Sequence, residues 1–170
     1  MFFRACCWGL VWITTTVSAH PISLTSTDIQ IREGALAVRI EVMLEDLVLF
    51  HSLKPVRESL YTQDDLRAAA LLHQDVLISG LTLLDGQGKR MEGTASPLDL
   101  SALTEAVPQE HLMQRRLRFD FTYQRVLPSK FLTVVHRLGE NDVGVPAIMD
   151  LSIQRDGAWI HRPSQLMLPA

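Results

Sequence analysis

Histidine is the residue type in this chain with the clearest metal-binding chemistry, and one of its six copies holds a special position. His20 follows the stretch TTTVSA, so cleavage after Ala19 would make it the first residue of the mature protein. An N-terminal histidine chelates Cu(II) through its α-amine and Nδ1, and imidazole suits copper and nickel in general. Pro21 leaves that amine free but has no backbone N–H, which excludes a square-planar site through its amide. His20 is therefore a metal-ligand candidate that needs a second histidine.

Five further histidines are candidates for that second ligand: His51, His73, His111, His136 and His161. None of them forms an HxH, HxxxH or HExxH motif. If His136 and His161 face each other across neighbouring strands, they complete a site with His20. We predict His20, His136 and His161 as ligands of a copper or nickel ion. The alternative for a single histidine is structural, with His51 hydrogen-bonded at a strand end and His73 packed on a helix face.

Other residue types give weaker patterns. Glu45 and Asp46 are adjacent, so on a strand their side chains point to opposite faces and cannot act as one acid–base pair. No GxSxG elbow occurs, and the GxG at residues 86–88 reads as a turn rather than a phosphate cradle. The sequence therefore predicts a protein that is not an enzyme. A hydrolase remains the alternative if Asp46, His51 and His136 cluster in a pocket.

The first 19 residues have the three parts of a secretory signal peptide. Arg4 supplies positive charge, residues 5–17 are apolar, and Val17 and Ala19 are the small residues before the cleavage point. The apolar run is shorter than the roughly 20 residues that span a bilayer. We expect cleavage and export to the periplasm or the extracellular space, with retention as an uncleaved anchor as the alternative.

Composition limits the partners of the remaining residues 20–170, which we expect to form a single domain without a transmembrane span. The chain has 16 basic and 19 acidic residues, a net charge of −3, and no basic face that would indicate nucleic acid. Both cysteines, Cys6 and Cys7, lie in the signal, so the exported domain has no disulfide and no thiolate ligand.

Alternation of apolar and polar residues predicts mostly β-structure. Residues 24–32 and 35–45 alternate with period two around Gly34 and predict a hairpin. Residues 117–123 alternate likewise, and residues 131–138 are apolar on both faces, which indicates a central strand. Residues 81–84 and 89–93 suggest a short hairpin, and residues 148–154 and 159–168 suggest two further strands.

One segment has a helical period. Thr62 stands three residues before Asp65 as an N-cap, and an apolar stripe follows to Leu77 before Gly80. We expect this helix near residues 63–79 and a weaker one over residues 100–106, with residues 110–114 ambiguous. About seven short strands with one inserted helix predict an antiparallel β-sandwich, Ig-like in broad shape.

The stretch AHPISLTSTDIQIREGALAVRIEVMLEDL, residues 19–47, resembles the start of the exported domain in HupE/UreJ-type hydrogenase/urease accessory proteins. Those domains also begin at an AHP cleavage site, continue as a hairpin and reach an acidic xxDL. The resemblance implies an association with the handling of nickel or related metals, and it includes His20. This chain lacks the apolar runs that form the membrane portion of such proteins, so their transport role is not carried over.

We therefore expect a non-enzymatic extracytoplasmic binding or accessory module of unknown ligand. Its partner would be an integral membrane protein or a metal-trafficking protein. The alternative is a copper- or nickel-binding accessory protein that uses the mature N-terminal His20 and a second histidine.

Overall fold

The computed structural model of the chain describes residues 23–32, 34–57, 59–124, 132–137, 147–155 and 158–163. Of these, residues 23, 24, 147–150 and 159–163 are described by their backbone alone. The structure is mostly strand, in agreement with the predicted β-rich class. Its strands are β1 Ser23–Arg32, β2 Ala35–Met43, β3 Leu60–Tyr61, β4 Leu81–Leu84, β5 Gly93–Ala95, β6 Val107–Pro108, β7 Arg116–Gln124, β8 Thr133–His136, β9 Ala147–Arg155 and β10 Ala158–Pro163. Its helices are α1 Leu44–Phe50, α2 Gln63–Gly80 and the 3-10 helix η1 Gln109–Gln114.

Six strands form the main sheet in the order β10-β9-β1-β2-β7-β5. The predicted hairpin is confirmed as β1 and β2, which pair antiparallel and turn at Gly34 with a positive φ of 75°. β1 lies between β2 and β9, and its pairing with β9 is parallel, so the main sheet is mixed and not antiparallel throughout as predicted. Two smaller sheets, β3–β6 and β4–β8, complete the described part.

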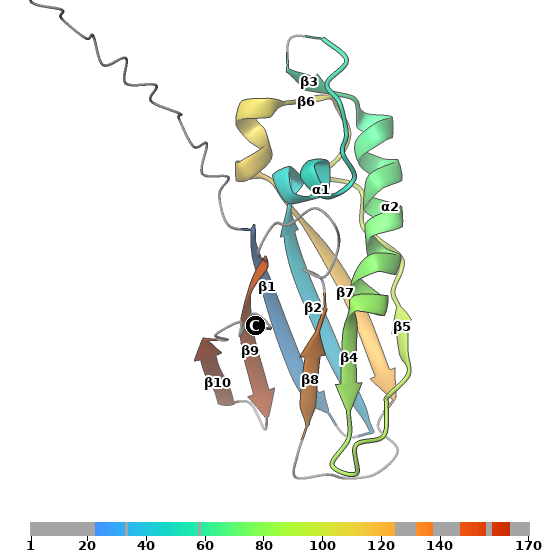
Figure 1. The fold of residues 1–170 in the computed structure, drawn as a ribbon, viewed down its shortest axis with the longest axis vertical. Helices are drawn as coiled ribbons and strands as arrows, with labels where there is room; N and C mark the ends of the chain where they lie inside the picture. The colour runs from blue at the N-terminus through green and yellow to red at the C-terminus, as the bar shows by residue number, and fades with distance from the viewer. Residues whose placement is uncertain are drawn as a thin grey trace, which may run out of the picture.

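One face of the main sheet is covered and the other is open. In Figure 1, helices α1 and α2 and the β4–β8 pair lie over the same face of the sheet. The inward side chains of β2 and β7 are buried and join residues of α1, α2 and β4 in one core. Burial of these alternate apolar side chains contributes the hydrophobic free energy that stabilises the packing of the two layers. Apart from Met43, the described intervening side chains of β1, β2 and β7 are polar or small, and they remain partly exposed.

The predicted helix near residues 63–79 is confirmed as α2. The Thr62 side chain accepts a hydrogen bond from the Asp65 N–H at 3.1 Å, as an N-cap does. The predicted stripe is buried: Leu66, Ala69, Ala70, His73 and Leu77. Gly80 is the last residue of the helix, within one residue of the predicted end, and β4 begins directly after it at Leu81.

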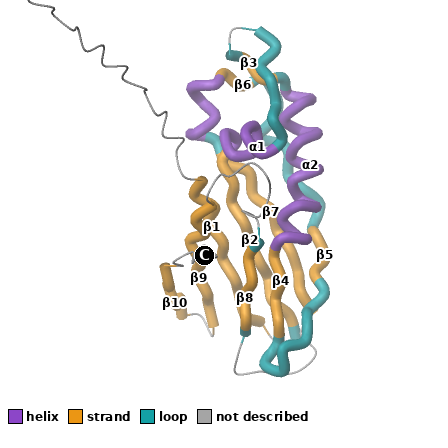
Figure 2. The backbone as a smooth tube through the Cα atoms, in the orientation of Figure 1, coloured by secondary structure: helices purple, strands orange, loops and turns teal. Residues whose placement is uncertain are grey.

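Three local predictions were wrong, and a fourth is confirmed only in part. The strand expected over residues 35–45 ends at Met43, and α1 follows it; Figure 2 shows this helix directly after the strand. The helix expected over residues 100–106 is not formed: Leu103 N–H bonds to the Leu100 carbonyl in a turn, and no further bonds continue it. The short hairpin expected over residues 81–84 and 89–93 is formed in part: Leu84 and Arg90 make an antiparallel bridge, and Met91 N–H and Asp85 N–H bond to the carbonyls of Leu83 and Lys89. In the described part, β8 has β4 as its one partner, so it is not central.

None of the helices in the described part is long and apolar enough to cross a membrane. The predicted signal at residues 1–19 lies outside the described residues, and so do residues 164–168 of the strand expected over 159–168.

Gly93 in β5 lies directly against a buried ring of β7. A Cβ at this position would lie 2.5 Å from Cε1 and 2.7 Å from Cζ of Tyr123, which is 2% exposed. We expect Gly93→Ala to lower the free energy of unfolding by about 1–3 kcal/mol, because the buried ring has little room to move. Urea denaturation measures the loss. The loss should shrink in a Tyr123→Leu background, and an equal loss in both backgrounds would show that the ring is not the cause.

Candidate functional site

The structure brings two of the candidate histidines together. His51 follows the last residue of α1, and its backbone N–H bonds to carbonyls of that helix. His73 lies on the buried face of α2 and is 6% exposed. Nε2 of His51 and Nδ1 of His73 are 3.2 Å apart and form a hydrogen bond. We call these two residues the histidine pair.

Aromatic rings enclose the histidine pair. The Phe50 ring contacts both imidazoles, each at a centroid distance of 5.1 Å and nearly edge-on. Phe119 of β7 approaches His73 at 5.9 Å from the sheet side. α1, α2 and the main sheet therefore meet at the pair, which three packed elements hold in place.

Burial keeps the histidine pair neutral. It lowers the pKa of His73 to about 4, and the neighbouring His51 adds to that effect. Burial also lowers the pKa of the more exposed His51. At neutral pH one ring nitrogen of the pair donates and the other accepts, and both rings retain nitrogens able to bind a metal.

The predicted site of His20, His136 and His161 is only partly described. His20 lies outside the described residues. His136 lies on β8 opposite Leu81, and its partly buried ring has a lowered pKa. The backbone of His161 lies on β10 opposite Ser152. β8 and β10 belong to different sheets, so these two histidines are not on paired neighbouring strands, and the three-ligand site stays a prediction.

The carboxylates also lie differently from the expectation. Glu45 and Asp46 occupy the first turn of α1 rather than a strand, where negative charge suits the helix dipole. His51 pairs with His73, not with His136. Within the described ranges, no group of three or more His, Cys, Asp and Glu residues is arranged to hold a metal ion.

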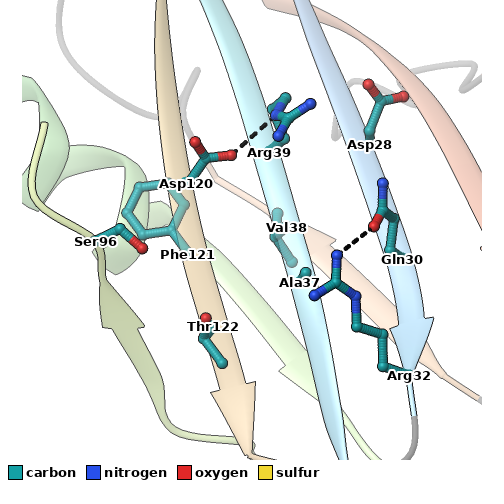
Figure 3. Close-up of a pocket in the computed structure, with 10 residues that line it drawn as sticks. All are labelled: Asp28, Gln30, Arg32, Ala37, Val38, Arg39, Ser96, Asp120, Phe121 and Thr122. Carbon is teal, nitrogen blue, oxygen red and sulfur yellow. Dashed lines mark hydrogen bonds and ion pairs between the residues drawn. The ribbon is translucent and has the colours of Figure 1, made fainter. Parts of the chain in front are cut away.

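A second candidate site is a polar hollow on the open face of the main sheet. Its volume is about 130 Å³, and we call it the sheet hollow. Figure 3 shows its side chains on β1, β2 and β7, with Ser96 at one side. The lining residues are Asp28, Gln30, Arg32, Ala37, Val38, Arg39, Ser96, Asp120, Phe121 and Thr122.

Strand register explains how the sheet hollow forms. Asp28, Arg39 and Asp120 are successive partners across β1, β2 and β7, so they form one row on the open face. In the adjacent row Gln30 and Thr122 flank Ala37, whose small side chain leaves the depression. A row of long polar side chains beside a small residue thus makes a shallow site on a rigid sheet.

Two arginines supply hydrogen-bond donors to the sheet hollow. Arg39 Nε donates to Asp120 Oδ1 at 2.9 Å, and Arg118 Nε lies 3.3 Å from the other carboxylate oxygen. Arg32 Nη2 donates to Gln30 Oε1 at 2.8 Å, so the Gln30 amide orients that guanidinium (Figure 3). Each guanidinium has five N–H donors, and these bonds use one of them. Among the described residues no other hydrogen bond engages these two guanidinium groups, so their remaining donors are available to a ligand.

Sequence reasoning missed both places for the same reason. The polar face of residues 35–45 was visible as alternation, but Asp120 joins it only through the pairing of β2 with β7. His51 and His73 are separated by 22 residues, and the unexpected helix α1 sets the position of His51. The one available signal was His73 on the apolar stripe of α2, which requires a buried polar partner.

Comparison with known proteins does not place the chain in a family: no family model, no curated protein and no solved structure matches it.

Proposed function

We propose that this protein is a non-enzymatic, extracytoplasmic binding module that takes a carboxylate-bearing ligand in the sheet hollow. The observation behind the proposal is the pair of arginines, Arg32 and Arg39, on neighbouring strands beside the Ala37 floor. Guanidinium groups match carboxylates in geometry and form charge-assisted hydrogen bonds with them. The N–H groups of these two arginines that donate to no described residue point to a ligand that accepts hydrogen bonds.

The chemistry of the lining favours binding over catalysis. Arginine stays protonated in proteins, so Arg32 and Arg39 bind and orient a ligand but do not transfer protons. Asp120 forms ion pairs with two guanidinium groups, Arg39 and Arg118, at 2.9 and 3.3 Å, so its carboxylate already has partners within the protein. Asp28 lies beside Arg39 in the same row and supplies acceptors for a donor elsewhere on the ligand.

The first 19 residues support the extracytoplasmic location, because they have the charge, apolar run and small residues of a cleaved signal. The resemblance of residues 19–47 to the exported domain of HupE/UreJ-type accessory proteins supports a role beside an integral membrane or metal-trafficking protein. On this proposal the ligand is a small carboxylate-bearing molecule or an acidic side chain of such a partner.

We also infer that the fold is a β-sandwich in which the β4–β8 pair is the second layer and the helices close one end. Leu81 and Leu83 of β4 support this arrangement, because they are 1% and 0% exposed and belong to the same core as β2 and β7. An experimental structure that placed β4 away from the main sheet would contradict it.

Succinate is a suitable probe of the proposed function. We expect added succinate to shift the backbone amide NMR signals of β1, β2 and β7 at the sheet hollow, whereas glucose leaves them unchanged. Arg39→Gln should weaken succinate binding about tenfold, since a charge-assisted hydrogen bond is worth about 1.5 kcal/mol.

Arg116→Gln is the matched control, because Arg116 lies on the same sheet outside the sheet hollow and pairs with Glu41 at 3.9 Å. It should bind succinate as the wild type does. Absence of shifts with succinate, equal shifts with glucose, or equal weakening in both variants would contradict the proposal.

A further inference from the structure

We propose that the histidine pair is a binding site for a single divalent transition-metal ion, with Nε2 of His51 and Nδ1 of His73 as its two protein ligands. The site is separate from the sheet hollow and does not depend on His20. It also differs from the predicted ligand set, since His136 and His161 take no part in it.

The separation of the two nitrogens is the first observation behind this proposal. Two imidazole nitrogens bound to one tetrahedral ion at about 2.0–2.1 Å each lie about 3.3 Å apart. Nε2 of His51 and Nδ1 of His73 are 3.2 Å apart. The two nitrogens are therefore already at the required separation, and only the partly exposed His51 ring needs to rotate when an ion enters.

The protonation states of the two imidazoles allow a metal ion to replace the hydrogen bond between them. In the hydrogen bond one of the two facing nitrogens has a proton and the other has a lone pair. When the donating ring moves its proton to its other nitrogen, both facing nitrogens present lone pairs. No proton is released, and both imidazoles remain neutral, which is the form that binds metals.

The two proposed ligands differ in their position in the fold, since one is buried and the other is accessible to solvent. His73 is 6% exposed and is held by α2, Phe50 and Phe119, so its ring orientation is fixed before binding. His51 is partly exposed at the end of α1 and gives an ion a route from solvent. Water would occupy the remaining coordination positions.

The ligand type identifies the class of ion. Two neutral imidazoles suit Cu(II), Ni(II) and Zn(II) and disfavour Mg(II) and Ca(II), which prefer oxygen ligands. For the same nitrogen ligands, divalent affinity rises to a maximum at copper. We therefore expect the order Cu(II) above Ni(II) and Zn(II), with no measurable binding of Mg(II).

Calorimetric titration of the purified, processed protein with Cu(II) tests the site. His51→Ala should lower the affinity for this ion at least tenfold, because it removes the accessible ligand and leaves the buried core intact. His111→Ala is the matched control, since His111 is an exposed histidine of η1 and its loss should change nothing. His20→Ala should leave the ion at the histidine pair in place.

A second measurement reports on His73 without a substitution in the core. In ¹⁵N-labelled protein, Zn(II) should shift the imidazole nitrogen signals of His51 and His73 together, and the signals of His111 should stay unchanged. Equal Cu(II) affinity in the wild type and His51→Ala, or binding that is lost only in His20→Ala, would overturn the proposal. So would a Zn(II) titration that leaves the nitrogen signals of His73 unshifted.

Discussion

Phe119→Ala should lower the free energy of unfolding by about 3–5 kcal/mol, the largest loss that we expect from one substitution in this chain. Phe119 is 0% exposed and is the partner of Ile40 in the pairing of β7 with β2. Its ring packs against His73 on α2, so it joins the main sheet to the layer of helices. Alanine would remove that contact and leave a cavity where the two layers meet. Urea denaturation, followed by circular dichroism, measures the loss.

Two controls separate the effect of the cavity from a general effect of substitution. Phe119→Leu keeps most of the apolar volume and should cost clearly less than Phe119→Ala. Met113→Ala removes an apolar side chain that is 52% exposed and should cost almost nothing. If Phe119→Ala lowered the free energy of unfolding no more than Met113→Ala does, the contact between the main sheet and α2 at Phe119 would be contradicted.

The regular elements could be predicted where local pattern and burial agree. The β1–β2 hairpin has alternating residues on both sides of Gly34, and α2 has both an N-cap at Thr62 and an apolar stripe. In each case the signal lies within one segment. Side-chain burial in the structure follows the same periods, so sequence and fold agree at these elements.

The helix α1 could not be found in this way. Leu44 is buried and continues the alternation of β2, so the pattern gives no sign that the strand ends at Met43. No side chain caps the start of this helix. The carbonyl of Arg115 accepts the N–H of Leu44, a contact between residues far apart in the sequence. Tertiary structure thus decides where the strand ends and the helix begins.

Pairing between distant strands decides the sheet hollow. The sequence predicts a strand over residues 148–154, but nothing local shows that this strand, β9, is the parallel partner of β1, which is more than 100 residues away. Arg39 and Asp120 meet only because β2 and β7 pair in one particular register. A shift of that register by one residue would exchange the polar and buried faces of β7, and the sheet hollow would not form.

Acid should destabilise the metal-free protein through His73, by about 2 kcal/mol between pH 7.5 and pH 5. Its pKa is about 4 in the folded protein, against an ordinary value of 6.5 when unfolded. Above the unfolded pKa both states are neutral, and the stabilising effect of the neutral pair is fully present. As the pH falls below 6.5 the unfolded chain takes up the proton first, so the free energy of unfolding decreases. The full loss, about 3 kcal/mol, is reached below the folded pKa.

Urea denaturation at several pH values, with a chelator present, measures this dependence, and the window above pH 5 keeps most carboxylates ionised. His73→Leu should flatten most of the curve, because it removes the group whose pKa is lowered to about 4. The slope left over belongs to His51 and His136, whose pKa values burial also lowers. His111→Leu should keep the wild-type slope, since that side chain is exposed. An NMR titration gives the pKa of His73 directly, without a substitution. A folded-state value near 6.5, or equal slopes in the wild type and His73→Leu, would mean that the histidine pair is open to water and that α1 and α2 do not enclose it.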